Sequence, residues 1–197
     1  MMKRYSKACE RNQEPIGDVL AEVLAPSATV LEVGSGTGQH AAAFAKRFSG
    51  IIWQPTNRPG RLDSIRAWRR DADLENICAP LEFDLFDDNA PIDEADAVMA
   101  TNVIHIAPWE AVDRLFFHAS QVLNPGGLVI LYGPYRYEGR PLEPSNERFD
   151  QHLRARDPKS GIRLFEEVDE VAQEYGFSHR ETRRLPANND IHWWVKS

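Results

Sequence analysis

Apolar residues recur along this chain with two spacings, and segments of the two kinds alternate. The short apolar run at 28–33 indicates a buried strand, whereas apolar residues three and four positions apart between Ile16 and Leu24 indicate one face of a helix. Proline fits a helix only in its first turn, so we expect this helix to contain Pro15 at its start and to run to about Leu24. Alternating strands and helices are typical of an α/β protein.

The predicted elements keep alternating as far as residue 132. In chain order they are a strand at 29–33, a helix at 39–48, a strand at 50–54 ended by Pro55, a helix at 62–71, strands at 77–83 and 95–100, a helix from Pro108 to the turn at 124–127, and a strand at 128–132. Continuous apolar strands are typical of a parallel sheet that is buried on both faces. We therefore expect a doubly wound sheet with helices on both faces.

The last third of the chain departs from this alternation. Residues 134–145 are rich in proline, glycine and charge and predict a loop, followed by a short helix at 146–156 behind a Ser145 cap. A further helix should end at Gly176. Two β-like segments at 177–185 and 191–195, joined by turn-forming residues, predict a terminal antiparallel hairpin. No repeat or linker interrupts the chain, so residues 1–197 are expected to form one domain.

A compressed glycine loop follows the first predicted strand. Glu32, Gly34, Ser35, Gly36, Thr37 and Gly38 form it, with three glycines spaced by single residues between a strand and a helix. Glycine lets the backbone turn tightly and lets a ligand approach it closely. The dinucleotide fingerprint needs a longer glycine spacing, so a nucleoside cofactor is favoured over NAD. The alternative is a plain surface turn.

A second group of candidates follows the fourth predicted strand, at the edge where open α/β sheets bind ligands. Asn102 comes directly after that strand, and His105 is a candidate general base because the ordinary histidine pKa lies near neutrality. Tyr135, after the fifth strand, is a second catalytic candidate. The alternative for His105 is a packed, hydrogen-bonded residue.

Composition narrows the function classes. The net charge is −7, which argues against general binding to nucleic-acid backbones and favours a small-molecule partner. The two cysteines lie far apart and indicate neither a disulfide framework nor a metal cluster, so no metal is expected. No apolar run is long enough for a membrane span or a signal sequence, and a cytoplasmic protein is expected.

The glycine loop resembles motif I of class I S-adenosylmethionine (SAM)-dependent methyltransferases. Dispersed motifs extend the likeness over nearly the whole chain to the methyltransferase-like 26 family, long described as a domain of unknown function. They are residues 10–16, 36–40, 53–55, 102–110, 131–135, 145–146, 149–150, 153–158, 161–163 and 186–189. The resemblance implies a Rossmann-like fold, with a mostly parallel seven-stranded sheet and a C-terminal antiparallel hairpin. It also implies a SAM pocket, but no particular substrate.

The resemblance also implies roles for residues after the second and third strands. An acid at the end of strand two usually accepts both ribose hydroxyls, and the family typically has Asp where this chain has Asn57. An amide has one accepting oxygen, so Asn57 should weaken ribose binding by roughly 0.5–1.5 kcal/mol, the contribution of one hydrogen bond. The alternative for Asn57 is a simple turn. Asp84 lies where related methyltransferases bind the adenine amine, with Leu85 in backbone contact.

The acceptor and the N-terminal segment supply the remaining candidates. Residues expected around an acceptor are Tyr132, Asn146, Phe149, Asp150, Arg154, Asn188 and Asn189. Arg154 is suited to a carboxylate or phosphate, although a surface salt bridge is the commoner use of an arginine. Residues 1–27 are a candidate lid in which Arg11 pairs with the cofactor carboxylate. For Asn12 the rival interpretation is a helix N-cap.

Three hypotheses follow from these observations. The first is SAM-dependent methyl transfer to an unidentified acceptor, most simply a small molecule. The second is a catalytically silent SAM-binding or protein-interaction module, which the replacement of the usual acid by Asn57 favours. The third, nicotinamide-dependent oxidoreduction, keeps a similar topology but lacks the glycine spacing that NAD requires.

Overall fold

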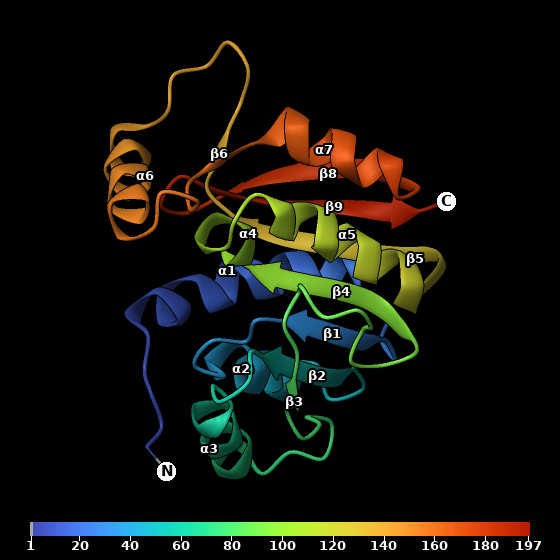
Figure 1. The fold of residues 1–197 in the computed structure, drawn as a ribbon. Coiled ribbons are helices and arrows are strands. Elements are labelled where there is room, and N and C mark those ends of the chain that lie inside the picture. Colours follow the sequence, from blue (N-terminus) through green and yellow to red (C-terminus); the bar gives the residue numbers. More distant parts are fainter. Residues whose placement is uncertain (1) are drawn as a thin grey trace.

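Seven strands form one sheet in the computed structural model, which describes residues 2–197 (Figure 1). Met1, part of the segment expected to act as a lid, lies outside the described residues. In chain order the strands of this sheet are β1 (Thr29–Val33), β2 (Ile52–Asn57), β3 (Leu81–Glu82), β4 (Ala95–Thr101), β5 (Leu123–Gly133), β8 (Phe177–Leu185) and β9 (Asn189–Lys196). Their spatial order is β3-β2-β1-β4-β5-β9-β8, and the pairings are parallel except for β5–β9 and β8–β9. The predicted Rossmann-like sheet with a terminal antiparallel hairpin is confirmed.

Helices cover both faces of the sheet. They are α1 (Lys7–Val23), α2 (Gln39–Arg47), α3 (Asp63–Ala72), α4 (Val103–Ile106), α5 (Glu110–Val122), α6 (Pro144–Arg156) and α7 (Phe165–Glu174). On one face, Ile16 of α1 and Phe44 of α2 pack in a buried cluster with Val30 of β1. On the other face, buried apolar residues of α5 and α7 form a second cluster with Leu31 of β1 and Val98 of β4. Alternate residues of each strand therefore enter two different cores, as the pleat of a strand requires.

The parallel strands β1, β2, β4 and β5 end at one edge of the sheet, which we call the carboxyl edge. Figure 1 shows this edge on the left, where the strand arrows of β1, β2 and β4 point. The N-terminal segment and α3 lie beside its lower part, and α6 lies at its upper part. Loops that follow these strands therefore meet at one place, which is where open α/β sheets bind ligands.

The start of α1 differs from the prediction. The helix begins at Lys7, so Pro15 lies in its interior rather than in its first turn. Ser6 is the N-cap, and its side chain accepts a hydrogen bond from the Cys9 N–H at 3.4 Å. A proline inside a helix removes one backbone hydrogen bond and crowds the carbonyl four residues before it, a cost that burial of Ile16, Val19 and Leu20 on α1 helps to offset. Asn12 is consequently a mid-helix residue and not an N-cap.

Strand β2 also differs, because it continues through Pro55 to Asn57. Pro55 pairs with Glu32 of β1, and the position of its missing N–H is on the side of β2 that faces away from β1. There the Gln54 side-chain amide donates to the carbonyl oxygens of Pro55 and Ala79, at 3.0 and 2.9 Å. The third strand is shorter than predicted: only Leu81–Glu82 joins the ladder, and Ile77 forms an isolated bridge.

Two predictions for residues 134–145 need correction. The segment is not only a loop, because it contains β6 (Tyr135–Arg136), which pairs in parallel with β7 (Arg163–Leu164). The helix α6 begins at Pro144, and Ser145 does not cap it; the Ser145 hydroxyl instead accepts a hydrogen bond from Asn188 at 3.0 Å. Proline at the first helical position needs no N–H partner and explains the earlier start.

Candidate functional site

The glycine loop at 34–38 joins β1 to α2 in a conformation that favours glycine. Its three glycines have φ angles of +68°, +56° and +91°. A Cβ at Gly34 would lie 2.8 Å from Val103 Cγ2, and one at Gly38 would lie 2.8 Å from Ile65 Cα. At Gly36 the nearest atom would be 4.0 Å away. Gly34 and Gly38 are therefore required by packing, whereas the Cβ direction of Gly36 faces open space.

Buried hydrogen bonds hold this loop from beneath. The Ser35 N–H donates to the Thr56 carbonyl at 2.7 Å, and the Ser35 hydroxyl donates to Glu32 Oε2 at 2.8 Å. Trp53 Nε1 donates to the same carboxylate oxygen at 3.0 Å. Burial raises the pKa of Glu32, against the opposing effect of these two donors. Glu32 thus supports the loop, and its direct contact with a cofactor stays a prediction.

Asn57 and Asn102 flank the glycine loop at the ends of the neighbouring strands. Asn57 Nδ2 donates to the Gly36 carbonyl at 3.4 Å, and its Oδ1 accepts from the Arg58 N–H at 2.9 Å. Asn102 has a φ of +59°, and its N–H donates to the Tyr132 carbonyl at 2.8 Å. The structure therefore brings Asn57 against the loop and places Asn102 at the end of β4, beside β1. Thr37, also in the loop, contacts Gln39 through its hydroxyl at 3.2 Å.

Asp84 and Leu85 follow β3 in a tight turn. Asp84 Oδ1 accepts from the Phe86 N–H at 3.2 Å, and the Asp84 N–H donates to Asp87 at 2.9 Å. Leu85 is buried, and its carbonyl accepts from Arg114 and His118 of α5. Their expected contacts with an adenine ring stay predictions, since both residues already have partners within the protein.

His105 and Tyr135 are buried next to each other, and His105 packs against Gly133. Their rings meet edge to face with centroids 5.2 Å apart. Within residues 2–197, neither imidazole nitrogen of His105 nor the Tyr135 hydroxyl has a hydrogen-bond partner. Burial lowers the pKa of His105 to about 3, with the Arg163 charge adding to the shift. Burial also raises the pKa of Tyr135 well above its ordinary value. His105 is packed but not hydrogen-bonded, and its use as a base stays a prediction.

The N-terminal segment crosses the glycine loop, through residues that the sequence did not single out. Arg4 Nη2 donates to the Gly36 carbonyl at 3.2 Å, and the Arg4 N–H donates to Ser64 Oγ at 2.9 Å. Trp68 Nε1 of α3 donates to the Arg4 carbonyl at 2.8 Å. Ser6 is joined to Gln39 through its N–H and its carbonyl. These contacts link residues far apart in the chain, and no local motif signals them.

Arg11 and Asn12 lie on α1, near Tyr132 at the end of β5. Asn12 Oδ1 lies 2.8 Å from His40 Nε2, and burial lowers the pKa of His40 to about 4. Tyr132 lies near both residues: burial raises its pKa, while Asn12 and the Arg11 charge oppose the rise. Arg11 is exposed and forms no ion pair within the described part of the chain. Its guanidinium therefore remains available to a ligand carboxylate.

Two predicted acceptor residues, Asn146 and Asn188, connect α6 to the turn between β8 and β9, and a third, Asn189, lies in that turn. Asn146 Nδ2 donates to the Asn188 carbonyl at 2.8 Å. Asn188 has a φ of +56° and donates from its amide to Ser145. Asn189 donates to the carbonyls of Pro186 and Ala187 within the same turn. These bonds explain the asparagines structurally, and contact with an acceptor stays a prediction. Phe149 of α6 is 36 % exposed.

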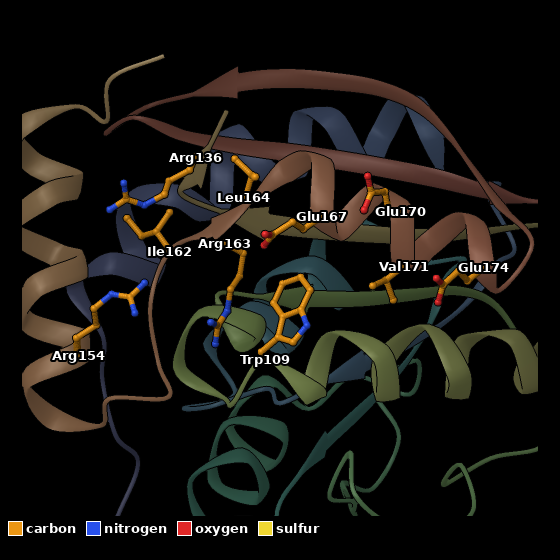
Figure 2. A pocket seen from close by; sticks show the side chains of 10 residues that line it. All are labelled: Trp109, Arg136, Arg154, Ile162, Arg163, Leu164, Glu167, Glu170, Val171 and Glu174. Carbon is orange, nitrogen blue, oxygen red and sulfur yellow. The ribbon is translucent and has the colours of Figure 1, made fainter. Parts of the chain in front are cut away.

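Arg154, which bonds Asp150, lines an open cavity of about 680 Å³ that does not include the glycine loop (Figure 2). Arg154 Nε and Arg136 Nη2 donate to Asp150 Oδ2 at 2.9 and 3.2 Å, while the Ile162 N–H donates to Oδ1 at 2.7 Å. Arg136 was not among the predicted residues. Among residues 2–197 as a whole, no cluster of three or more His, Cys, Asp or Glu side chains could hold a metal ion. No helix among the described residues combines the length and apolar character of a membrane span.

The strand order, the glycine loop after β1 and the terminal hairpin define the class I methyltransferase fold. The chain belongs to the DUF938 family, described as a protein of unknown function, whose model matches residues 3–196. It is 27 % identical over 176 residues to sterol methyltransferase-like 3 of Botryococcus braunii, covering 87 % of this chain and 44 % of that protein.

Solved structures have the same fold at lower identity. An O-methyltransferase family protein from Burkholderia thailandensis matches with a TM-score of 0.82 and 21 % identity, over 96 % of this chain and 57 % of that one. Human N-acetylserotonin methyltransferase in complex with SAM matches with a TM-score of 0.78 and 17 % identity, over 96 % and 55 % of the two chains. This chain spans about half the length of the relatives that it matches.

Proposed function

We propose that this chain binds S-adenosylmethionine at the carboxyl edge and transfers its methyl group to a small-molecule acceptor. One observation carries the proposal: a compressed glycine loop after β1 lies between Asn57 and Asn102, at the ends of the two adjacent strands. The three similar proteins described above are named as methyltransferases, which supports the same chemistry. We also propose that the chain is related to the methyltransferase-like 26 family, which its dispersed motifs resemble.

The residues at this edge fit the cofactor. A ligand can approach the Gly36 backbone because no atom lies within 4.0 Å in its Cβ direction. Asn57 would hold the ribose, Asp84 and Leu85 the adenine, and Asn102 the region next to the reacting group. Arg11 would pair with the cofactor carboxylate, an ion pair of the kind that arginine forms with two parallel hydrogen bonds.

When bound, the cofactor supplies a methyl group activated by an adjacent sulfonium. The chain would contribute mainly by orienting the acceptor and excluding water, which can lower a barrier by several kcal/mol, roughly 7–11 in favourable cases. A histidine with a pKa of about 3 is a weak base at neutral pH. Transfer to an acceptor that is already nucleophilic therefore fits this site better than transfer that needs His105 to remove a proton.

The proposal is tested by calorimetric titration with SAM and with S-adenosylhomocysteine, and by the same titrations on Gly36→Arg. We expect micromolar binding to the unmodified chain and none to the variant, because the new side chain would fill the open space beside the loop. Gly126→Arg is a matched control. Gly126 also has a positive φ, +88°, with no atom within 4 Å of its Cβ position, but it lies in the turn before residues 128–133, at the far end of β5.

Binding that survives Gly36→Arg, or that is lost equally in Gly126→Arg, contradicts the proposed site. Binding without methyl transfer to any acceptor would favour the alternative of a silent SAM-binding module. The single-domain organisation, the cytoplasmic location and the absence of general nucleic-acid binding, expected from the sequence, stay predictions.

A further inference from the structure

The cavity shown in Figure 2 lies between α6, β6–β7 and α7, apart from the glycine loop. Its floor contains Trp109 and Val171. Three arginines, Arg136, Arg154 and Arg163, line the cavity, and Arg163 lies beside Glu167 and Trp109 in Figure 2. At one end, Asp150 is the only carboxylate among the described residues that bonds Arg136 and Arg154. This end of the cavity therefore carries an excess of positive charge.

Asp150 holds Arg136 and Arg154 in place through one hydrogen bond from each, which leaves other donors of both guanidinium groups free of this carboxylate. Both donate to the same oxygen, Oδ2, while the other oxygen accepts from the Ile162 backbone. Their side chains are 42 % and 49 % exposed, whereas that of Asp150 is 8 % exposed. A guanidinium has five N–H donors, so each arginine keeps donors that can bond a ligand in the cavity. The shared carboxylate orients them in advance.

Arg163 adds a charge that no carboxylate neutralises by contact. Its guanidinium donates to three carbonyl oxygens, those of Ile104, Ala107 and Lys159, at 2.9, 2.6 and 2.9 Å. Arg163 is only 8 % exposed and forms no ion pair within residues 2–197. Its carbonyl partners carry no net charge, so a bound anion would add an attraction to this buried cation beyond that of the more distant Asp150, Glu110 and Glu167.

The opposite wall limits what can bind. Glu167, Glu170 and Glu174 form one stripe along α7 and face the cavity, as Figure 2 shows. They would repel an extended polyanion such as nucleic acid but leave room for a compact anionic group at the arginine end. The arrangement favours a small ligand.

We propose that this cavity is a binding site for a small anion, a phosphate or carboxylate group, bonded by Arg136 and Arg154 and attracted by Arg163. Arginine suits both groups because its planar fork matches two oxygens at once. The site is separate from the proposed cofactor site and does not depend on methyl transfer. Arg163 also joins the site to α4, because it donates to the carbonyl oxygens of Ile104 and Ala107, on either side of His105 in the chain.

The test is calorimetric titration of the full chain with inorganic phosphate and, separately, with citrate at constant ionic strength. We expect at least one of them to bind, and Arg154→Gln and Arg136→Gln each to weaken it about 10-fold or more, as expected for a charged hydrogen bond. Arg148→Gln is the matched control, since Arg148 is exposed on the same helix and does not line the cavity. It should change the affinity less than 2-fold, or about 0.4 kcal/mol.

Glu167→Gln is a second variant, on the exposed face of α7, and should tighten binding about 2-fold because it removes repulsion. It keeps the test informative if Arg136→Gln, which also removes an anchor of Asp150, does not fold. Preferential binding of phosphate or of citrate identifies which anionic group the site takes. The inference is overturned if neither anion binds with a Kd below about 10 mM, which corresponds to a binding free energy of roughly 3 kcal/mol. It is also overturned if Arg148→Gln weakens binding as much as Arg154→Gln. Binding of S-adenosylhomocysteine should be unchanged in all four variants, which separates this result from the proposed function.

Discussion

The glycine-loop side of the carboxyl edge and the side formed by α4 and β6 differ in whether their buried polar side chains have hydrogen-bond partners. Beside the loop, Ser35 and Trp53 both donate to the Glu32 carboxylate, and the bond from Trp53 links β2 to β1. Around α4 and β6, His105 and Tyr135 are equally buried but have no partner in the described chain. A buried polar group without a partner costs about 1–3 kcal/mol. The buried polar groups beneath the loop are therefore satisfied within the protein, whereas those of His105 and Tyr135 are not.

The largest expected effect comes from the glycine loop. Gly38→Ala should lower the free energy of unfolding by roughly 2–4 kcal/mol, because it combines a left-handed φ with a Cβ against Ile65. Gly126→Ala has nearly the same φ but open space, so it should cost only about 1 kcal/mol. Urea unfolding of the two variants measures the difference. Equal losses would show that backbone strain alone, and not close packing, requires Gly38.

The side around α4 and β6 should become unstable in acid. Burial lowers the pKa of His105 to about 3, below the ordinary value of 6.5, so the folded state binds its proton less readily than the unfolded state. Its contribution is complete above pH 6.5 and falls as the pH drops toward 3. By pH 4 the loss should be on the order of 3 kcal/mol, since each pH unit corresponds to about 1.4 kcal/mol.

The measurement compares unfolding free energies from pH 7 to pH 4 for the unmodified chain and for His105→Phe. The variant should lose less stability on acidification. His152→Gln serves as the control, because His152 is exposed on α6 and should leave the pH dependence unchanged. Parallel curves for all three proteins would show that His105 is not the neutral buried group described above. His40 and His192, whose pKa values burial lowers to about 4 and about 3, should add to the acid sensitivity of all three proteins.

The next prediction concerns the N-terminal segment over the loop. Arg11→Gln should weaken binding of S-adenosylhomocysteine about 10-fold, as expected for a charged hydrogen bond, if Arg11 pairs with the ligand carboxylate. Methylthioadenosine lacks that carboxylate and should bind both proteins equally. Calorimetry with the two ligands is the measurement, and equal weakening of both would assign Arg11 a structural role.

The smallest effect is expected at Asn57. Asn57→Asp should tighten binding of SAM by about 2- to 12-fold, which corresponds to the 0.5–1.5 kcal/mol of one hydrogen bond. Asn57 now donates to the Gly36 carbonyl, a bond that a carboxylate cannot make, so part of the gain is offset. Calorimetric titration measures the change. Unchanged or weaker binding would indicate that residue 57 does not contact the ribose.

The sequence predicted those parts of the molecule that depend on local patterns. The strand at Thr29–Val33 and the glycine loop follow from a continuous apolar run and from glycine spacing, and both are confirmed. The start of α1 was missed because Pro15 outweighed the weaker cap signal of Ser6. The strands β6 and β7 are two residues each and show no periodicity, so their pairing across the chain leaves no local signal. The contacts of Arg4 and Arg136 are equally non-local.

The central claim is that a nucleoside cofactor binds at the glycine-loop side of the carboxyl edge. Hydrogen exchange measured with and without saturating S-adenosylhomocysteine tests it most directly, because amide protection reports local stabilisation by a ligand. We expect protection to rise at residues 34–38, at Asn57, around Asp84 and Asn102, and in the N-terminal segment, with little change in α7. Protection confined to α6 and α7, or none anywhere, would contradict the claim.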